Sequence, residues 1–343
     1  MLTERQDRIL QFIVSEYIAT AKPVGSAYIA SRYGLGVSPA TIRNEMAHLE
    51  NGGYISRKHI SGGGVPSDKG YRHYVRTLAF DDAVPTEEHL MLSHLFHQVE
   101  RELEEWTHLA AAMLSRMVNS VAVVTSPRAD SCHLKHIELV ALRDYLALLV
   151  LLFHEARLRQ QLLAFDRPIS QHELDVIGNE MNNIYSDLTW DQIVDHGAYL
   201  TSVQQQVRDT IVQLMASEDR NQYLNPYIEG VRLMLTQPEF ERRRDALNIM
   251  EILESKEMVS TLLPGIPSDQ GVNVVIGEEN SEEALKMCSL VITQYGVPGK
   301  VSGVVGVIGP TRMQYRRAIS AVRCISSLLS DLIAEIYSGM DSR

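Results

Sequence analysis

The side chains best suited to recognise a ligand lie in one short segment, residues 38–54. Its Arg43 can donate two hydrogen bonds to guanine, and its Asn44 can pair with adenine, in the major groove of DNA. Small side chains let a helix approach the base edges closely. We therefore predict a DNA-contacting face from this segment, formed by Ser38, Ala40, Thr41, Arg43, Asn44 and His48.

The same segment carries the signals of a complete, short α-helix. Ser38 can cap the N-terminus, and Pro39 suits the first helical position, where a missing N–H costs nothing. Gly52 and Gly53 favour a left-handed exit from the helix. Apolar residues recur at the spacing of one buried stripe: Ile42, Met46 and Leu49. Burial of this stripe turns the polar and basic residues away from the core.

Short elements are expected on both sides of this helix: helices over 2–17 and 26–33, a tight turn at 34–36, and strands over 54–59 and 62–66. Thr3 and Gln6 have the spacing of a capping box at the start of the first helix. The two strands flank a glycine-rich tip, which is typical of the wing in a winged helix-turn-helix. We predict that Arg57, Lys58 and His59 of this wing contact DNA phosphates. The alternative is a helical subdomain with a solvated polar face.

Charge divides the chain in the same way. Residues 1–78 contain 10 basic and 6 acidic residues, a net charge of +4, whereas the remainder contains 22 and 37, a net charge of −15. Phosphate contacts dominate non-specific affinity for DNA, so a basic N-terminal region on an acidic body confines DNA to one end.

Length and composition fit a soluble, intracellular protein. The 343 residues predict two or three domains, and 45% hydrophobic content is ordinary for a globular chain. Three cysteines form no disulfide framework, which favours a reducing cytoplasm. The chain begins with a polar, capped helix rather than a signal peptide. Its longest apolar run, 145–153, is far shorter than the roughly 20 residues that a membrane helix needs.

The rest of the chain predicts an α+β fold with a discontinuous domain. Helices are expected over 86–118, 170–188, 201–217, 240–263 and 312–337, with a less regular stretch at 223–235. Strands are expected over 121–125, 133–142, 145–153, 157–165, 272–276, 289–295 and 300–308. Strands before and after a mainly helical middle indicate an insertion. The predicted domains are 1–78, then 79–167 with 265–343, and the insertion 168–264.

Other clusters of polar residues give weaker signals. His94 with His97, and Cys132 with His133 and His136, offer nitrogen and sulfur atoms but lack a complete zinc ligand set. We predict no metal and no cofactor. The glycine-rich stretch 303–309 lacks the context of a dinucleotide site. Three arginines at the start of the last helix could hold an anion, but we expect them to pair with acidic groups of the body: Arg312, Arg316 and Arg317. No catalytic constellation is recognisable, so we predict that the protein is not an enzyme.

Three motifs in order resemble the heat-inducible transcription repressor family HrcA: Ser-Pro-Ala-Thr-Ile-Arg-Asn-Glu-Met (38–46), Val-Pro-Ser-Asp-Lys-Gly-Tyr-Arg (65–72) and Gly-Val-Ile-Gly-Pro-Thr-Arg-Met-Gln-Tyr (306–315). The resemblance implies a winged-helix domain, a GAF-like domain and a dimerising domain inserted into the latter. It also implies a cytoplasmic bacterial repressor that binds an inverted-repeat operator, CIRCE, upstream of chaperonin genes. In this family the GroEL chaperonin supports the activity of the repressor.

The wing departs from the family pattern at one position. The family usually has Ala-Gly-Arg before the Val/Ile-Pro pair, whereas this chain has Gly64 in place of the arginine. A wing contact to phosphate or to the minor groove is therefore either missing or supplied by Arg57 or Lys58.

Binding to an inverted repeat requires a two-fold symmetric protein, so we expect a homodimer. Candidate apolar contacts in the insertion are Ile211, Leu214 and Met215, or the stretch 223–235, although each of these residues can also belong to an ordinary core. A second function class remains open, in which a metabolite bound in the GAF-like pocket shifts the spacing of the DNA-binding domains. Operator affinity that depends on such a ligand would favour this class, and dependence on the chaperonin would favour the repressor.

Overall fold

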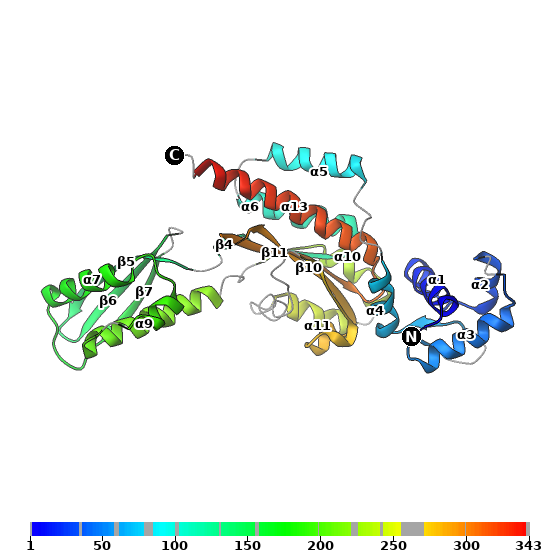
Figure 1. Cartoon of the computed structure of the whole chain (residues 1–343), viewed down its shortest axis with the longest axis horizontal. Coiled ribbons are helices and arrows are strands. Elements are labelled where there is room, and N and C mark those ends of the chain that lie inside the picture. Colours follow the sequence, from blue (N-terminus) through cyan, green and yellow to red (C-terminus); the bar gives the residue numbers. More distant parts are fainter. Residues whose placement is uncertain are drawn as a thin grey trace. The chain divides into compact units, whose positions relative to one another are not determined.

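The computed structural model describes residues 2–340, apart from 34–35, 58–61, 79–84, 100–102, 130–131, 155–157, 198, 221–225, 241–242, 255–270 and 299. The chain divides into two compact units (Figure 1). Unit 1 comprises residues 1–127, 225–297 and 303–343, and unit 2 comprises residues 128–224 and 298–302. Within unit 1, we call residues 2–78 the head and the remainder the body.

The described part of the head forms the expected winged helix-turn-helix. Its elements are α1 (Glu4–Thr20), α2 (Ser26–Arg32), α3 (Pro39–Asn51), β1 (Ile55–Ser56), β2 (Val65–Pro66) and α4 (Asp68–Thr77). The capping box of Thr3 and Gln6 is present, and β1 pairs with β2 in antiparallel fashion. At the end of α3, only Gly53 is left-handed, with φ 74°, whereas Gly52 keeps a right-handed φ of −76°.

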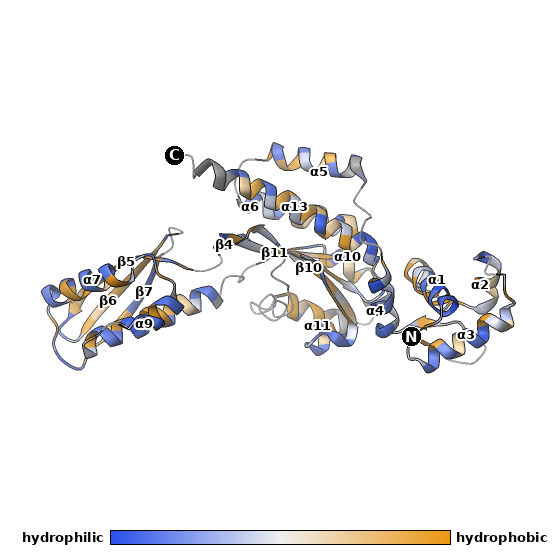
Figure 2. Ribbon diagram, viewed as in Figure 1, coloured by the Kyte–Doolittle hydropathy of each residue, from blue (hydrophilic) through white to orange (hydrophobic). Residues whose placement is uncertain are grey.

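The core of the head lies mainly between α1 and α3. Its fully buried side chains include Ile9, Leu10, Ile13, Ile29, Ile42, Met46 and Leu49. Hydrophilic and hydrophobic residues alternate along α3 in Figure 2, as expected for a helix with one buried face. This apolar stripe decides which side of α3 remains available to a ligand.

The body is built on one sheet with the strand order β8-β3-β11-β10-β9, and β4 also pairs with β11. The strands of the body are β3 (Val121–Val124), β8 (Tyr227–Glu229), β9 (Asn273–Ile276), β10 (Cys288–Val297) and β11 (Val301–Pro310), whereas β4 (Arg128–Ala129) and the first two residues of β11, with which it pairs, belong to unit 2. The helices of the body are α5 (Thr86–Gln98), α6 (Leu103–Val118), α10 (Val231–Leu235), α11 (Arg243–Glu254) and α13 (Tyr315–Met340). Helix α13 packs on β10, α6 packs on β3, and the two helices contact each other.

Unit 2 is a three-stranded antiparallel sheet with helices on one side. Its elements are β5 (Leu134–Arg143), β6 (Leu146–Phe153), β7 (Leu158–Ala164), α7 (Gln171–Tyr185), α8 (Trp190–Asp195) and α9 (Ser202–Arg220). Alternate residues of β6 join a core with α7 and α9. Asn182 of α7 accepts from Ile137 N–H at 2.7 Å and donates to Ile137 O at 2.8 Å. These bonds attach α7 to the edge strand β5.

The limits of the insertion differ from the predicted 168–264. The strands β5, β6 and β7 belong to unit 2, because α7 and α9 cover one of their faces. The chain returns to the body at β8, which pairs with β3 through Ala122 and Glu229. Helices α10 and α11 therefore belong to unit 1. No sequence pattern indicates which helices cover which strands.

Other differences concern single elements. The helix predicted over 86–118 is two helices, α5 and α6, because the backbone becomes extended at Val99. The stretch 223–235 contains β8 and α10, and the last part of the helix predicted over 240–263 lies outside the described residues. Among the described residues, no helix is both long and apolar enough to span a membrane.

Two helical glycines provide a test of the packing around α4. A Cβ on Gly70 would lie 2.2 Å from the carbonyl oxygen of Tyr54, whereas a Cβ on Gly178 of α7 would have no neighbour within 4 Å. We expect Gly70→Ala to lower the free energy of unfolding by about 1–3 kcal/mol through overpacking. Gly178→Ala should raise it by about 0.5–1 kcal/mol, because alanine favours helices. Urea titration followed by circular dichroism measures both; a stabilised Gly70→Ala variant would contradict this packing.

Candidate nucleic-acid interface

Helix α3 is held in the head by its cap and its buried stripe. Ser38 Oγ accepts a hydrogen bond from Thr41 N–H at 3.2 Å, and Pro39 lies in the first turn. The predicted stripe of Ile42, Met46 and Leu49 is buried, with at most 1% of each residue exposed. Burial of the stripe fixes the rotation of α3 about its axis, so it determines which side chains face outward.

The outward residues predicted from the sequence share the opposite face of α3. Thr41 is half-buried, and the other five are exposed: Ser38, Ala40, Arg43, Asn44 and His48. Within the described part of the chain, no ion pair or hydrogen bond involves the Arg43 guanidinium. The face thus combines small side chains with an amide and a free guanidinium, which is the chemistry needed to read base edges. Its contact with DNA stays a prediction.

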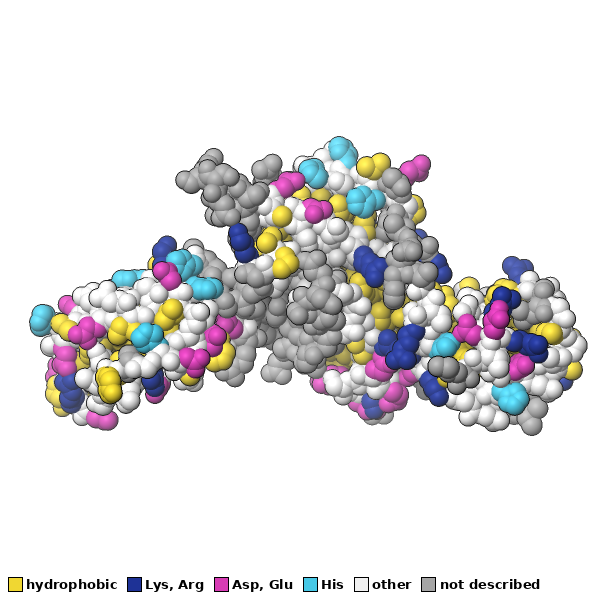
Figure 3. Space-filling model, viewed as in Figure 1, with side chains coloured by type: hydrophobic (Ala, Val, Ile, Leu, Met, Phe, Trp, Pro, Cys, Tyr) yellow, Lys and Arg dark blue, Asp and Glu magenta, His cyan; other side chains and the backbone are white. Residues whose placement is uncertain are grey.

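The acidic side chains on the flanks of α3 are both paired within the head. Glu45 lies 3.4 Å from Arg5 Nη1 and accepts a hydrogen bond from Gln6 Nε2 at 3.0 Å. Glu50 pairs with Arg57 at 2.5 Å. Figure 3 shows basic and acidic side chains interspersed on the visible face of the head. Pairing offsets the two negative charges of α3, which reduces their repulsion of a polyanion.

The sequence predicted that Arg57 contacts DNA, but in the structure its side chain is paired with Glu50 of α3. Its side chain is only 4% exposed, and its Nε donates to Glu50 Oε2 at 3.0 Å. Its backbone N–H also donates to Glu50 Oε1, at 3.1 Å. Arg57 therefore fastens the wing to α3, and we leave it out of the proposed interface. Lys58 and His59 lie outside the described residues.

The glycine that replaces the usual wing arginine lies over the core of the head. Gly64 exchanges two backbone hydrogen bonds with Val24, at 3.0 and 2.8 Å. A Cβ at this position would lie 3.1 Å from both Met46 Cε and Ile55 Cδ1. A side chain at position 64 would thus begin against the core rather than in solvent.

Two arginines that sequence reasoning missed lie beside α3. Arg5 and Arg8 line an open pocket of 460 Å³ with Thr3, Glu4 and Glu45. Their side chains are more than half exposed, although Arg8 pairs with Glu4 at 3.0 Å and Arg5 with Glu45. Exposed guanidinium groups at this edge are suited to phosphate oxygens. No motif marks them, because their closeness to α3 is a tertiary feature.

The residues considered for metal binding make other contacts. His97 Nδ1 lies 2.7 Å from Ser93 O, and His136 Nε2 lies 3.3 Å from Glu138. No group of three or more His, Cys, Asp or Glu side chains that could hold a metal occurs within the described ranges. Of the three C-terminal arginines, Arg312 pairs with Glu239 at 2.5 Å, as the sequence predicted.

Two known families match separate stretches of the chain. Residues 1–61 match the family described as LexA DNA binding domain, which includes α1, α2 and α3. Residues 104–319 match the family described as HrcA protein C terminal domain. The first match agrees with the geometry of the head, and the second covers more than half of the chain.

Curated relatives resemble the chain over nearly its whole length. A protein of Dehalococcoides mccartyi named heat-inducible transcription repressor HrcA is 45% identical over 98% of this chain and 97% of its own. Proteins of the same name from Roseiflexus castenholzii and Chloroflexus aurantiacus are 41% and 36% identical, each over 98% of this chain and 96% and 95% of their own. The crystal structure of a hypothetical protein, 21% identical, aligns with a TM-score of 0.57 over 97% of this chain and 98% of its own, and shares the fold.

Substitution of Arg57 and of Arg43 should distinguish an arginine that stabilises the head from one that is free to bind a ligand. Arg57→Ala leaves Glu50 without its partner, so we expect the free energy of unfolding to fall by about 1–3 kcal/mol. Arg43→Ala removes an exposed side chain and should change it by less than about 0.5 kcal/mol. Thermal and urea unfolding measure both variants. Equal stability of the two would mean that the Arg57–Glu50 pair does not support the head.

Proposed function

This chain belongs to the HrcA family of heat-inducible transcription repressors, and from that premise we propose that it represses chaperonin-class heat-shock genes. As a dimer, it binds an inverted-repeat CIRCE operator in the cytoplasm, and GroEL supports this activity. Each subunit inserts α3 into a major groove, and the bound dimer blocks transcription by occupying the promoter region. The protein is a regulator that binds DNA rather than an enzyme.

The observation that carries this proposal is the outer face of α3. Arg43 and Asn44 are exposed on a helix whose cap and buried stripe leave that face free. The residues proposed to contact DNA are Ser38, Ala40, Thr41, Arg43, Asn44 and His48, with Lys58 and His59 of the wing retained from the sequence. Arg5 and Arg8 are proposed as additional phosphate contacts.

The proposed dimer uses the open face of the sheet in unit 2. On this face Val140, Leu148 and Leu162 are register partners across the three strands. Val140 is 38% exposed and Leu162 is 54% exposed, as is expected of side chains that only a partner would cover. A two-fold operator requires a two-fold protein, so we propose a second copy of this chain as the partner.

The helical contacts first considered for the dimer are used inside unit 2 instead. Ile211 and Met215 are fully buried in its core, and Leu214 is partly buried against that core. These residues cannot form an intermolecular surface unless α9 leaves its own sheet. For these three residues, the alternative of an ordinary core role fits the packing of α9.

The second function class, a sensor of a small metabolite, receives no support from the interior of the body. Tyr295 Oη donates to Thr125 O at 2.5 Å, and Thr125 Oγ1 accepts from Val304 N–H at 2.8 Å. A Cβ on Gly303 would lie 2.5 Å from the Tyr295 ring, so the ring fills this part of the interior. These polar groups bind one another rather than pointing into a cavity.

A binding titration at fixed salt tests the proposed function. We expect the wild-type protein to bind the CIRCE inverted repeat more tightly than a scrambled duplex, and GroEL to strengthen this binding. Arg43→Ala should lose about 1–3 kcal/mol on the repeat and relax specificity, as expected of a base contact. An equal loss on both duplexes would assign Arg43 to a phosphate. Equal, weak binding of the wild-type protein to both duplexes would refute the operator.

A charge on the open sheet face should disrupt the dimer without unfolding unit 2. Leu162→Asp places a carboxylate at a position that is already 54% exposed in the single chain. We expect sedimentation analysis to show a monomer, because burial of an unpaired charge in an interface is costly. Val194→Asp on α8, at a position 52% exposed, is the matched control and should leave the dimer intact. A dimeric Leu162→Asp variant would exclude this face.

A further inference from the structure

Helix α4 is attached to the other elements of the head through one set of side chains. Lys69 Nζ donates to Gly52 O, at the C-terminal end of α3, over 2.7 Å. His73 Nε2 lies 2.5 Å from Asp7 Oδ1 of α1. Ser67, which caps α4, donates from its hydroxyl to Gly53 O at 2.6 Å. These contacts hold α4 against α1 and the end of α3.

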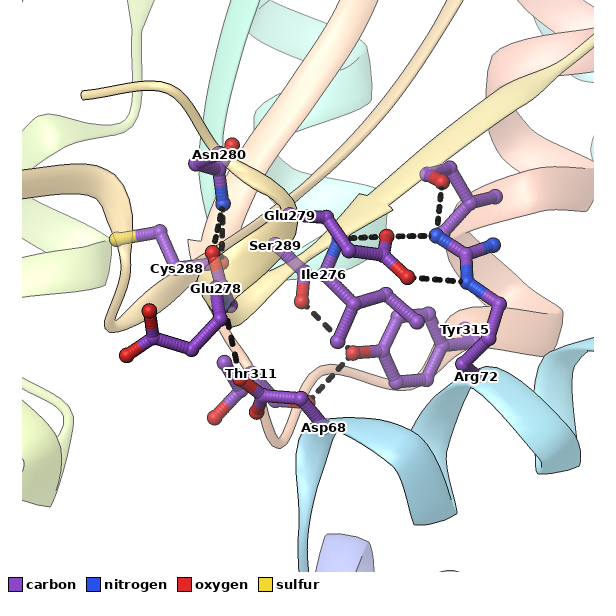
Figure 4. A network of polar contacts seen from close by, with 12 residues as sticks. Asp68, Arg72, Ile276, Glu278, Glu279, Asn280, Cys288, Ser289, Thr311 and Tyr315 are labelled. Carbon is purple, nitrogen blue, oxygen red and sulfur yellow. Dashed lines mark hydrogen bonds and ion pairs between the residues drawn. The ribbon is translucent and has the colours of Figure 1, made fainter. Parts of the chain in front are cut away.

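A second set of side chains on α4 binds the body (Figure 4). Arg72 Nε donates to Glu279 Oε1 at 2.7 Å, and its Nη2 donates to Val274 O at 2.5 Å and also to Glu279 Oε2. Asp68 Oδ2 accepts the backbone N–H of Glu278 at 2.9 Å. The acceptors and donors on the body lie in β9 and in the turn 277–279 that follows it.

The turn 277–279 is shaped to receive Asp68 and Arg72. Gly277 has a φ of 52°, and a Cβ there would lie 2.0 Å from Asp68 Oδ2, so no larger residue fits beside this carboxylate. Glu279 also accepts from Ile276 N–H at 2.9 Å, which orients it toward Arg72. Burial alone would raise the pKa of Glu279, but hydrogen bonds from Arg72 and Ile276 N–H lower it below its usual value. Glu279 is therefore charged at neutral pH.

We propose that α4 is a coupling helix and that the contact of Asp68 and Arg72 with the turn 277–279 is a latch. The closed latch fixes the end of α3 relative to the body, because Lys69 of the same helix holds Gly52. The open latch leaves the head attached by fewer contacts, so α3 changes its position. This inference rests on the proposed function, since an inverted repeat requires two recognition helices at a fixed spacing. Binding of the repeat and closure of the latch then favour each other reciprocally.

The test compares the inverted repeat with a single isolated half-site. Arg72→Gln and Glu279→Gln should each weaken binding to the repeat by about fivefold or more, the usual lower range of coupling between sites. Binding to the half-site, which needs no fixed spacing, should change by less than about twofold. The charge exchange Arg72→Glu with Glu279→Arg should recover part of the affinity for the repeat. Equal losses on both duplexes without recovery would mean that Arg72 contacts phosphate.

A matched control and a structural readout complete the experiment. Arg167→Gln breaks the exposed Arg167–Glu173 pair of unit 2 and should alter neither affinity. Hydrogen exchange at the Glu278 amide, whose N–H donates to Asp68, should accelerate in Arg72→Gln and slow in the wild-type protein when the repeat binds.

The inference and the proposed function fail in different ways. A wild-type protein that binds the repeat no better than a scrambled duplex would refute the proposed function and, with it, the coupling to an operator. A wild-type protein that binds the repeat specifically, while Arg72→Gln and Glu279→Gln keep both that affinity and the Glu278 exchange rate, would refute the latch alone.

Discussion

The close approach of α4 to the backbone that follows α3 is the constraint on which the arrangement of unit 1 depends. Gly70 lies so near the carbonyl oxygen of Tyr54 that no Cβ fits between them, and Ser67 N–H donates to the same oxygen. This contact fixes the rotation of α4. Consequently Lys69 and His73 face the head, whereas Asp68 and Arg72 lie against the body. Gly70 thus allows α4 to contact both the rest of the head and the body.

The sequence predicted α3 well because its signals are local. A cap, a proline at the first position, an apolar stripe and a terminal glycine all act within one or two helical turns, and each is found as predicted except that only Gly53 of the two glycines is left-handed. The role of Arg57 could not be predicted in the same way, since it depends on the position of Glu50 across the wing. The contact of Arg72 with Glu279 spans more than 200 residues of sequence and leaves no periodic pattern.

The limits of the insertion were predicted less accurately for a related reason. The sequence predicted strands over 133–142 and 145–153, which are β5 and β6, but the continuous apolar run of β6 does not say which of its residues are buried or which helix covers them. The helices α7 and α9, which follow these strands, provide the cover. The same ambiguity left Ile211, Leu214 and Met215 of α9 open as dimer contacts or core residues, and Ile211 and Met215 are fully buried in the core of unit 2. Periodicity reports burial, not the partner.

The pairing of β3 with β8 makes the body complete without its insertion. Ala122 and Glu229, on either side of nearly all of unit 2, are register partners in one antiparallel ladder, so the chain leaves and re-enters the body between hydrogen-bonded neighbours. The entropy of closing a loop grows only slowly with its length. The segment inserted between β3 and β8 can therefore become longer or shorter, or be replaced by another module, while the body keeps its sheet. A short turn from β3 to β8 would suffice to close the ladder as a hairpin.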